Sequence, residues 1–130
     1  MIVADASWVI ALRDPGDAHH RDASLLNDQT TNESIILHQV TLAECLVAPA
    51  KLGVLDDAAT ALRAAFDIAD TDDDAPVRWA SLRAVTGLRL PDVIVLDTAI
   101  RSGARAIITF DESLASKARE RGLDVNSAAP

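Results

Sequence analysis

The sequence has little cysteine and few aromatic residues, and each shortage excludes a kind of site. A single cysteine, Cys45, rules out an internal disulfide and any site built on a CxxC motif. Tyrosine is absent, and the 130 residues include two tryptophans and two phenylalanines. A surface that binds RNA by stacking bases on aromatic rings is therefore not expected. We expect an aliphatic core and a reducing, cytoplasmic setting.

Long apolar runs and an excess of positive charge are also missing. Eighteen uncharged apolar residues never follow one another, and the first residues lack the pattern of a signal peptide, so we expect neither export nor a membrane association. The formal net charge of -8 argues against a conventional nucleic-acid surface, which attracts phosphates with many basic side chains. Basic residues do cluster late in the chain. There Arg101 and Arg105 form an i, i+4 pair that either contacts RNA or only solvates a helix face.

Short apolar runs alternate with amphipathic segments along the whole chain. The runs predict strands over residues 1–4, 34–38, 67–69 and 106–109, with a further edge strand over 124–126. Helices are expected between them, with Ser7 as the N-cap of the first and Thr41 as the N-cap of the third. This alternation predicts an α/β fold, a central and mainly parallel sheet flanked by helices, in one domain over residues 1–130.

Four acidic residues occupy positions that a parallel sheet brings to one edge. Asp5 and Asp111 follow predicted strands, while Glu44 and Asp92 lie near the start of predicted helices. Ligands collect at the carboxyl edge of such sheets. Carboxylates gathered there repel one another, and a hard divalent cation is the usual stabilising partner. The sequence therefore predicts a metal site, although spacing alone does not prove that the four residues converge.

Three of these acids also have a structural interpretation. Glu44 matches a capping box with Thr41, Asp92 suits the positive end of its helix, and Asp111 suits an N-cap. Asp5 is harder to explain in this way, because a carboxylate directly after a buried strand needs a charged or hydrogen-bonded partner. The other reactive types give weaker signals: His19 and His20 lack further zinc ligands, and Cys45 lies in apolar surroundings that suggest a buried thiol.

Four segments, taken in order, resemble the motifs of PIN-domain ribonucleases, and most closely those of VapC-type toxins. They are Ile2-Val3-Ala4-Asp5-Ala6-Ser7, Thr41-Leu42-Ala43-Glu44, the stretch from Leu90-Pro91-Asp92 to Ala99, and Thr109-Phe110-Asp111. The resemblance spans nearly the whole chain and implies a PIN-like, three-layer fold. It also implies RNA cleavage dependent on Mg²⁺ or Mn²⁺, inhibition by a cognate VapB-type antitoxin, and a homodimer.

Carried over residue by residue, the resemblance assigns the catalytic acids to Asp5, Glu44, Asp92 and Asp111. Of these, Asp5 and Asp92 are expected to be the principal metal ligands, and Asp111 to bind the metal directly or through water. Glu44 is expected to orient or deprotonate the attacking water or to help hold a second metal. Ser7 and Thr109 match the family's small hydroxyl positions around the site. Asp97 departs from the family pattern, which has a small apolar residue there, and is either a surface residue or an outer metal ligand.

Two other functions stay open at this point. A receiver-like signalling module also has acids at the edge of a parallel sheet, but it needs an acidic pair after the first strand, and Asp5 has no acidic neighbour. A catalytically weak binding protein with an acidic metal site is the second alternative. Metal binding and RNA cleavage by an Asp5→Asn variant would separate that protein from the enzyme.

Overall fold

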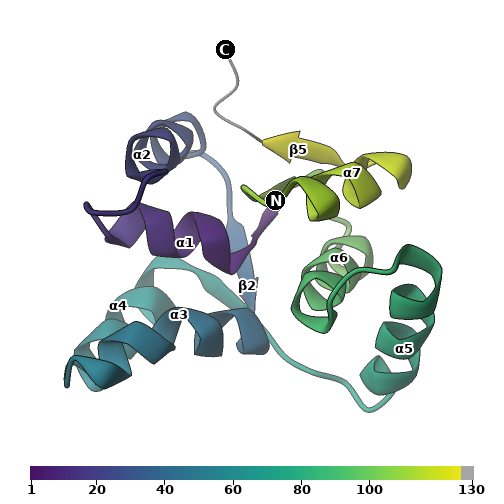
Figure 1. Ribbon diagram of the computed structural model, residues 1–130, viewed down its shortest axis with the longest axis horizontal. Helices are drawn as coiled ribbons and strands as arrows, with labels where there is room; N and C mark the ends of the chain where they lie inside the picture. The colour runs from purple at the N-terminus through teal and green to yellow at the C-terminus, as the bar shows by residue number, and fades with distance from the viewer. Residues whose placement is uncertain (127–130) are drawn as a thin grey trace.

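The computed structural model describes residues 1–126, in which five strands and seven helices alternate (Figure 1). The strands are β1 Ile2–Ala4, β2 Ile35–His38, β3 Asp67–Ala69, β4 Ala106–Ile108 and β5 Asp124–Asn126. The helices are α1 Ala6–Arg13, α2 His20–Gln29, α3 Gln39–Lys51, α4 Leu55–Ala65, α5 Ala75–Thr86, α6 Leu90–Ser102 and α7 Glu112–Glu120. Each predicted strand is present within one residue of its expected ends. No helix in residues 1–126 is long and apolar enough to cross a membrane.

The five strands form one parallel sheet in the order β3-β2-β1-β4-β5. In the middle of the sheet, Val3 of β1 pairs with Ile36 of β2 on one side and with Ile107 of β4 on the other. Both faces of this sheet are covered, which explains why its central strands read as continuous aliphatic runs and not as alternating ones. The fold is therefore the α/β fold that the sequence predicts.

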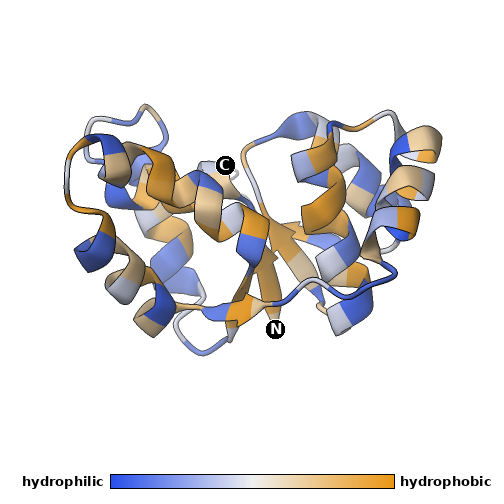
Figure 2. Ribbon diagram, turned by 90° about the horizontal axis from the view of Figure 1, so that it is seen from below, coloured by the Kyte–Doolittle hydropathy of each residue, from blue (hydrophilic) through white to orange (hydrophobic). Residues whose placement is uncertain are grey.

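Alternate side chains of each strand enter two separate cores. Ile2 and Ala4 of β1 pack with α1, α2, α3 and α4, whereas Val3 between them packs with α5, α6 and α7. Figure 1 shows the two groups of helices on opposite sides of the sheet, and Figure 2 shows hydrophobic strands between them. Trp8 is completely buried in the first core, where its indole N–H donates a hydrogen bond to the carbonyl of Ala23 at 3.2 Å. The result is a three-layer structure.

The strand order places a topological switch point between β1 and β4. The helix that follows β1 covers one face of the sheet, and the helix that follows β4 covers the other, so the chain leaves these neighbouring strands in opposite directions. Such a switch point leaves an opening at the carboxyl ends of the two strands, where ligands bind in folds of this class. Asp5 follows β1 directly, and Asp111 follows β4 after two residues.

Two of the predicted helix caps are wrong. Asp5, and not Ser7, is the N-cap residue of α1, and its side chain caps nothing. The N-cap of α3 is His38, whose imidazole Nδ1 accepts the N–H of Val40 at 3.0 Å, so Thr41 already lies inside the helix. The capping-box interpretation of Glu44 therefore fails, because the helix begins earlier and no longer needs that carboxylate at its N-terminus.

Asp97 joins α5 to α6. Its buried carboxylate accepts hydrogen bonds from Arg78 at 3.1 Å through both Nε and Nη2, and from the indole N–H of Trp79 at 3.0 Å. Arg78 also binds Asp72 with two hydrogen bonds, of 2.7 and 2.6 Å, which ties the loop before α5 to the same guanidinium. Asp97 is not a surface residue, and its partners give it a structural task between the helices.

We predict that Asp97→Ala destabilises the protein by about 2–3 kcal/mol, because Arg78 and Trp79 lose a partly buried acceptor. Urea unfolding would show a lower midpoint with an unchanged slope. Asp73→Ala, at an exposed position in the loop before α5, is the matched control and should change the free energy of unfolding by less than about 0.5 kcal/mol. If Asp97→Ala instead kept its stability and lost divalent-metal affinity, Asp97 would be an outer metal ligand after all.

Candidate metal centre

Asp5 is held at the end of β1 by two hydroxyl groups. Its Oδ2 accepts hydrogen bonds from Ser7 at 2.9 Å and from Thr109 at 2.8 Å, and its backbone N–H continues the sheet by donating to Ile108 at 2.9 Å. The residue is 8% exposed. Both donors hold the same oxygen, which orients the carboxylate and leaves Oδ1 free of either hydroxyl. These contacts place Ser7 and Thr109 beside Asp5.

The same hydroxyls bind the loop that carries Asp111. Thr109 accepts the backbone N–H of Asp111 at 2.9 Å, and Ser7 accepts the N–H of Phe110 at 3.1 Å. Asp111 then caps α7, with Oδ1 accepting the N–H of Leu114 at 2.9 Å. The N-cap interpretation of Asp111 is therefore confirmed. It does not exclude a second task, because capping occupies Oδ1 and leaves Oδ2 directed elsewhere.

Glu44 and Asp92 complete the cluster from two helices that meet at this edge, α3 and α6. Burial raises the pKa of Glu44 above its ordinary value, and the charges of Asp5 and Asp92 raise it further. Burial likewise raises the pKa of Asp92, with added contributions from Asp111 and Asp5. Asp92 thus lies within electrostatic reach of Asp5 and Asp111, and Glu44 lies within reach of Asp5 and Asp92.

A basic residue that the sequence analysis overlooked also reaches this cluster. Arg89 is the N-cap residue of α6, and its Nε lies 3.5 Å from Oδ2 of Asp92. Its Nη2 lies 4.0 Å from Oδ2 of Asp111. Its charge opposes the rise in the pKa of both Glu44 and Asp92. The available signal was its position three residues before Asp92, a spacing that places the two side chains on one side of the helix start.

The donor set fits a hard divalent cation, although the acids do not close into a ligand shell by themselves. In residues 1–126, no three side chains of His, Cys, Asp or Glu approach closely enough to hold an ion together. All four acids offer carboxylate oxygens, which Mg²⁺ and Mn²⁺ prefer, and no thiolate competes. Burial raises the pKa of the neighbouring Cys45 thiol to about 12, so it stays protonated. Repulsion between carboxylates accounts for their separation.

The structure separates the other predicted residues from this cluster. Arg105 lies at the amino edge of the sheet, away from the acids, and its guanidinium pairs with Glu33. Arg101 is in the last turn of α6, about 13 Å along the helix from Asp92 by the usual rise per residue. Asp97 faces α5, as described above. Residues 1–126 thus bring the four acids together with Ser7, Thr109 and Arg89.

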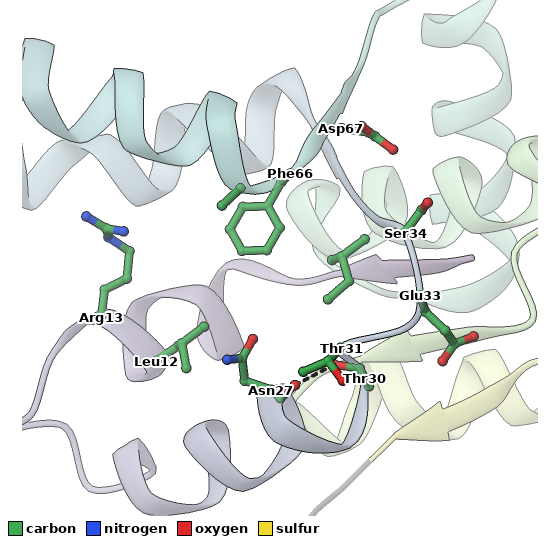
Figure 3. Close-up of a pocket in the computed structure, with 11 residues that line it drawn as sticks. Leu12, Arg13, Asn27, Thr30, Thr31, Glu33, Ser34, Phe66 and Asp67 are labelled. Atoms are coloured by element: carbon green, nitrogen blue, oxygen red, sulfur yellow. Dashed lines mark hydrogen bonds between the residues drawn. The ribbon is translucent and has the colours of Figure 1, made fainter.

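A cavity lies at the opposite edge of the sheet (Figure 3). It has a volume of about 730 Å³ and lies among the end of α1, the loop before β2 and the turn between α4 and β3. Its wall includes Leu12, Asn27, Glu33 and Phe66. The cavity is a mixed polar and apolar hollow at the amino ends of the strands, so it is separate from the acidic cluster.

Comparison with known proteins gives a family and several similar folds. The family model of the PIN domain matches residues 2–120. No curated protein matches the chain. Among solved structures, VapC20 from Mycobacterium tuberculosis, a Sarcin-Ricin loop cleaving toxin, has a TM-score of 0.74 at 18% identity, covering 90% of this chain and 95% of that one. A toxin-antitoxin complex from Klebsiella pneumoniae has a TM-score of 0.79 at 22% identity and covers 99% of this chain and 98% of the other.

A third similar structure is VapBC2 from Rickettsia felis, which was solved with a DNA fragment from its promoter. Its TM-score is 0.66 at 16% identity, and the match covers 97% of this chain and 98% of that one. At identities this low, the structural likeness shows a shared fold. The match to the family model is what shows the family itself.

We predict that Glu44→Gln stabilises the metal-free protein at pH 7. Because the pKa of Glu44 is raised above 4.5 on folding, the folded state binds this proton more tightly than the unfolded state. Ionised Glu44 therefore opposes folding, and this effect grows as the pH rises from 4.5 through the folded pKa. The gain should be about 0.5–2 kcal/mol at low salt, and it should vanish below pH 4.5.

Urea unfolding at pH 4 and pH 7 would measure this difference, with Glu120→Gln at the exposed end of α7 as the control. At both pH values, the free energy of unfolding of the control should differ little from that of the parent. A Glu44→Gln variant that was less stable than the parent at pH 7 would show that this carboxylate has a stabilising partner, and it would contradict the picture of a repelling cluster.

Proposed function

Because this chain belongs to the PIN domain family, we propose that it is a Mg²⁺- or Mn²⁺-dependent endoribonuclease and the toxin of a VapBC-type toxin-antitoxin pair. The observation that carries the proposal is that Thr109 links Asp5 to the loop of Asp111 and that Arg89 bridges Asp111 and Asp92. Glu44 lies near enough for the charges of Asp5 and Asp92 to raise its pKa. The likeness in fold to VapC20 and to the Klebsiella complex supports it. In this proposal residues 1–130 form a single PIN-like domain that works on RNA in the cytoplasm, as a homodimer.

Three of the acids would hold the cation. Asp5 and Asp92 are the principal ligands in this proposal, since both carboxylates are nearly buried and directed by their surroundings. Asp111 would bind directly or through water with Oδ2, while its Oδ1 keeps capping α7. A bound divalent cation would polarise the phosphodiester and offset the negative charge that develops on it. Ser7 and Thr109 would keep Asp5 in one orientation throughout.

Glu44 would handle the proton of the attacking water. Its carboxylate is half-buried on α3 and its pKa is raised, so it is a better proton acceptor near neutral pH than an ordinary glutamate. Water would attack phosphorus in line with the bond from phosphorus to the 3′-oxygen, and this bond would break. Glu44 would accept the proton of the water while the 3′-oxygen gains one, which leaves 5′-phosphate and 3′-hydroxyl ends.

The receiver-like alternative loses support from the strand order. Receiver-type folds of the flavodoxin class place their strands in the order 2-1-3-4-5, whereas this sheet has the order β3-β2-β1-β4-β5. The functional crevice therefore lies between β1 and β4 and not between β1 and β3. Asp5 also gains two hydroxyl partners and no acidic neighbour in the chain, which differs from a phosphoacceptor site.

We predict that Asp5→Asn lowers Mn²⁺-dependent cleavage of RNA at least about 100-fold, the scale seen when one electrostatic group of an active site is removed. The amide oxygen of the new side chain can still accept from Ser7 and Thr109, so the fold should persist. Cleavage would be followed on structured and unstructured RNAs with Mg²⁺, Mn²⁺ or a chelator. Asp28→Asn, exposed on α2, is the control and should match the parent. Full activity of Asp5→Asn, or activity in the chelator, would refute the mechanism.

An antitoxin segment would dock on exposed apolar side chains of the hairpin formed by α3 and α4. Val47, Leu52, Val54 and Leu55, which we call the hairpin patch, are between 41% and 78% exposed. Isolated exposed apolar residues need no explanation, but a run of four along one hairpin suggests a protein partner. A basic side chain of the bound segment would then reach the acidic cluster, which α3 also borders through Glu44.

We predict that Leu52→Asp weakens inhibition by the antitoxin at least about 10-fold and leaves RNA cleavage by the free enzyme unchanged, because a charge would be buried in an apolar contact. Leu52 is 78% exposed, so the variant should fold normally. Val77→Asp, 75% exposed on α5 beyond the other face of the sheet, is the matched control. The measurement is residual RNase activity as antitoxin is added. If both variants lost inhibition equally, the antitoxin would not bind at the hairpin patch.

A further inference from the structure

Arg89 combines a fixed backbone with an uncommitted side chain. Its carbonyl accepts the N–H groups of Asp92 and Val93 at 3.0 Å each, which secures the residue at the start of α6. The side chain is 76% exposed, and its two contacts with carboxylates, at 3.5 and 4.0 Å, are longer than good charge-assisted hydrogen bonds. A guanidinium held so loosely can change partners without disturbing the helix.

The two contacts of Arg89 are made with oxygens that a cation would also need. It faces Oδ2 of Asp92 on α6 and Oδ2 of Asp111 at the start of α7, so it bridges two of the four acids. The Asp92 side chain is 7% exposed, and Arg89 covers it from the solvent side. A divalent ion at about 2.1 Å from these oxygens carries twice the charge at a much shorter distance. The ion would therefore compete with the guanidinium for these oxygens.

A structural role for Arg89 alone is a weak explanation of this arrangement. The arginine of this i, i+3 pair is 76% exposed, so the pair contributes at most about 1 kcal/mol to stability, and the contact with Asp111 crosses to another element. A chain with a net charge of -8 also needs positive charge where an RNA phosphate approaches its acids. Arg101 and Arg105 lie elsewhere, whereas Arg89 lies beside the acids.

We propose that Arg89 exchanges partners during the reaction: it neutralises Asp92 and Asp111 in the metal-free protein, leaves them when a divalent cation binds, and then binds a phosphate of the RNA. This inference rests on the ribonuclease function proposed above. The planar guanidinium offers paired donors that match phosphate oxygens, which suits it to the second partner. Arg89 thereby opposes metal binding and favours RNA binding, so its removal has opposite effects on the two.

The test compares Arg89→Gln and Arg89→Lys with Arg63→Gln, an exposed arginine on α4, as the matched control. Titration calorimetry of Mn²⁺ without RNA is the first measurement. Arg89→Gln should bind Mn²⁺ about 3- to 10-fold more tightly than the parent, the size expected for loss of one exposed and salt-screened charge. Arg89→Lys should stay near the parent, because its ammonium still repels the ion, and Arg63→Gln should not change.

The second measurement is RNA cleavage at saturating Mn²⁺. Arg89→Gln should raise KM about 5- to 10-fold with kcat within about 3-fold, and the slope of log KM against log salt should fall by about 0.7 for the lost phosphate contact. The KM of Arg89→Lys should lie between those of the parent and Arg89→Gln, since an ammonium binds phosphate but cannot make the paired contact. A purely structural arginine would change the free energy of unfolding and leave the salt slope as it was.

The outcomes separate this inference from the function on which it rests. If the parent protein binds Mn²⁺ and cleaves RNA while Arg89→Gln binds Mn²⁺ no more tightly, or keeps its KM, the exchange of partners is wrong and the ribonuclease stands. If the parent neither binds Mn²⁺ nor cleaves RNA, the proposed function fails and the inference fails with it. Tighter Mn²⁺ binding together with weaker RNA binding would support both.

Discussion

Repulsion among four carboxylates at one edge of the sheet is the constraint on which the surrounding structure depends. Two of them, Glu44 and Asp92, have raised pKa values because they are partly buried beside other acids. Their ionised forms are therefore less stable in the folded protein than in water. A protein that only had to fold would avoid this arrangement. Its persistence is best explained by a ligand that carries positive charge, and function at such sites commonly costs stability.

Neutral hydrogen bonds and one positive charge oppose this repulsion. The hydroxyls of Ser7 and Thr109 hold Asp5 and at the same time bind the loop that carries Asp111, so one pair of small side chains joins the ends of β1 and β4. Arg89 supplies the positive charge from the solvent side. An aliphatic core on each face of the sheet offsets the destabilising effect of the clustered acids. The switch point between β1 and β4 lies beside Asp5 and Asp111.

The sequence predicted the architecture well because aliphatic strands and amphipathic helices report burial directly. The sequence also predicted that Asp5 and Asp111 follow the ends of β1 and β4, since each comes within three residues of an aliphatic run. Side-chain partners were harder to predict. His38 caps α3 because the helix begins one residue after it, which capping preferences alone do not indicate. Asp97 binds Arg78 because α5 packs on α6. Arg89 escaped notice because a single arginine before a helix has no distinctive pattern.

In the proposed function, a divalent cation, and not a basic surface, lies between the acidic protein and its anionic substrate. Diffraction from crystals soaked in Mn²⁺, recorded at the manganese absorption edge, tests this claim most directly. The account predicts an anomalous peak bounded by Asp5 and Asp92, at about 2.0–2.2 Å from their carboxylate oxygens, with the Arg89 side chain turned away from it. A peak at another part of the surface, or a fully bound Mn²⁺ with Arg89 still on Asp92 and Asp111, would contradict it.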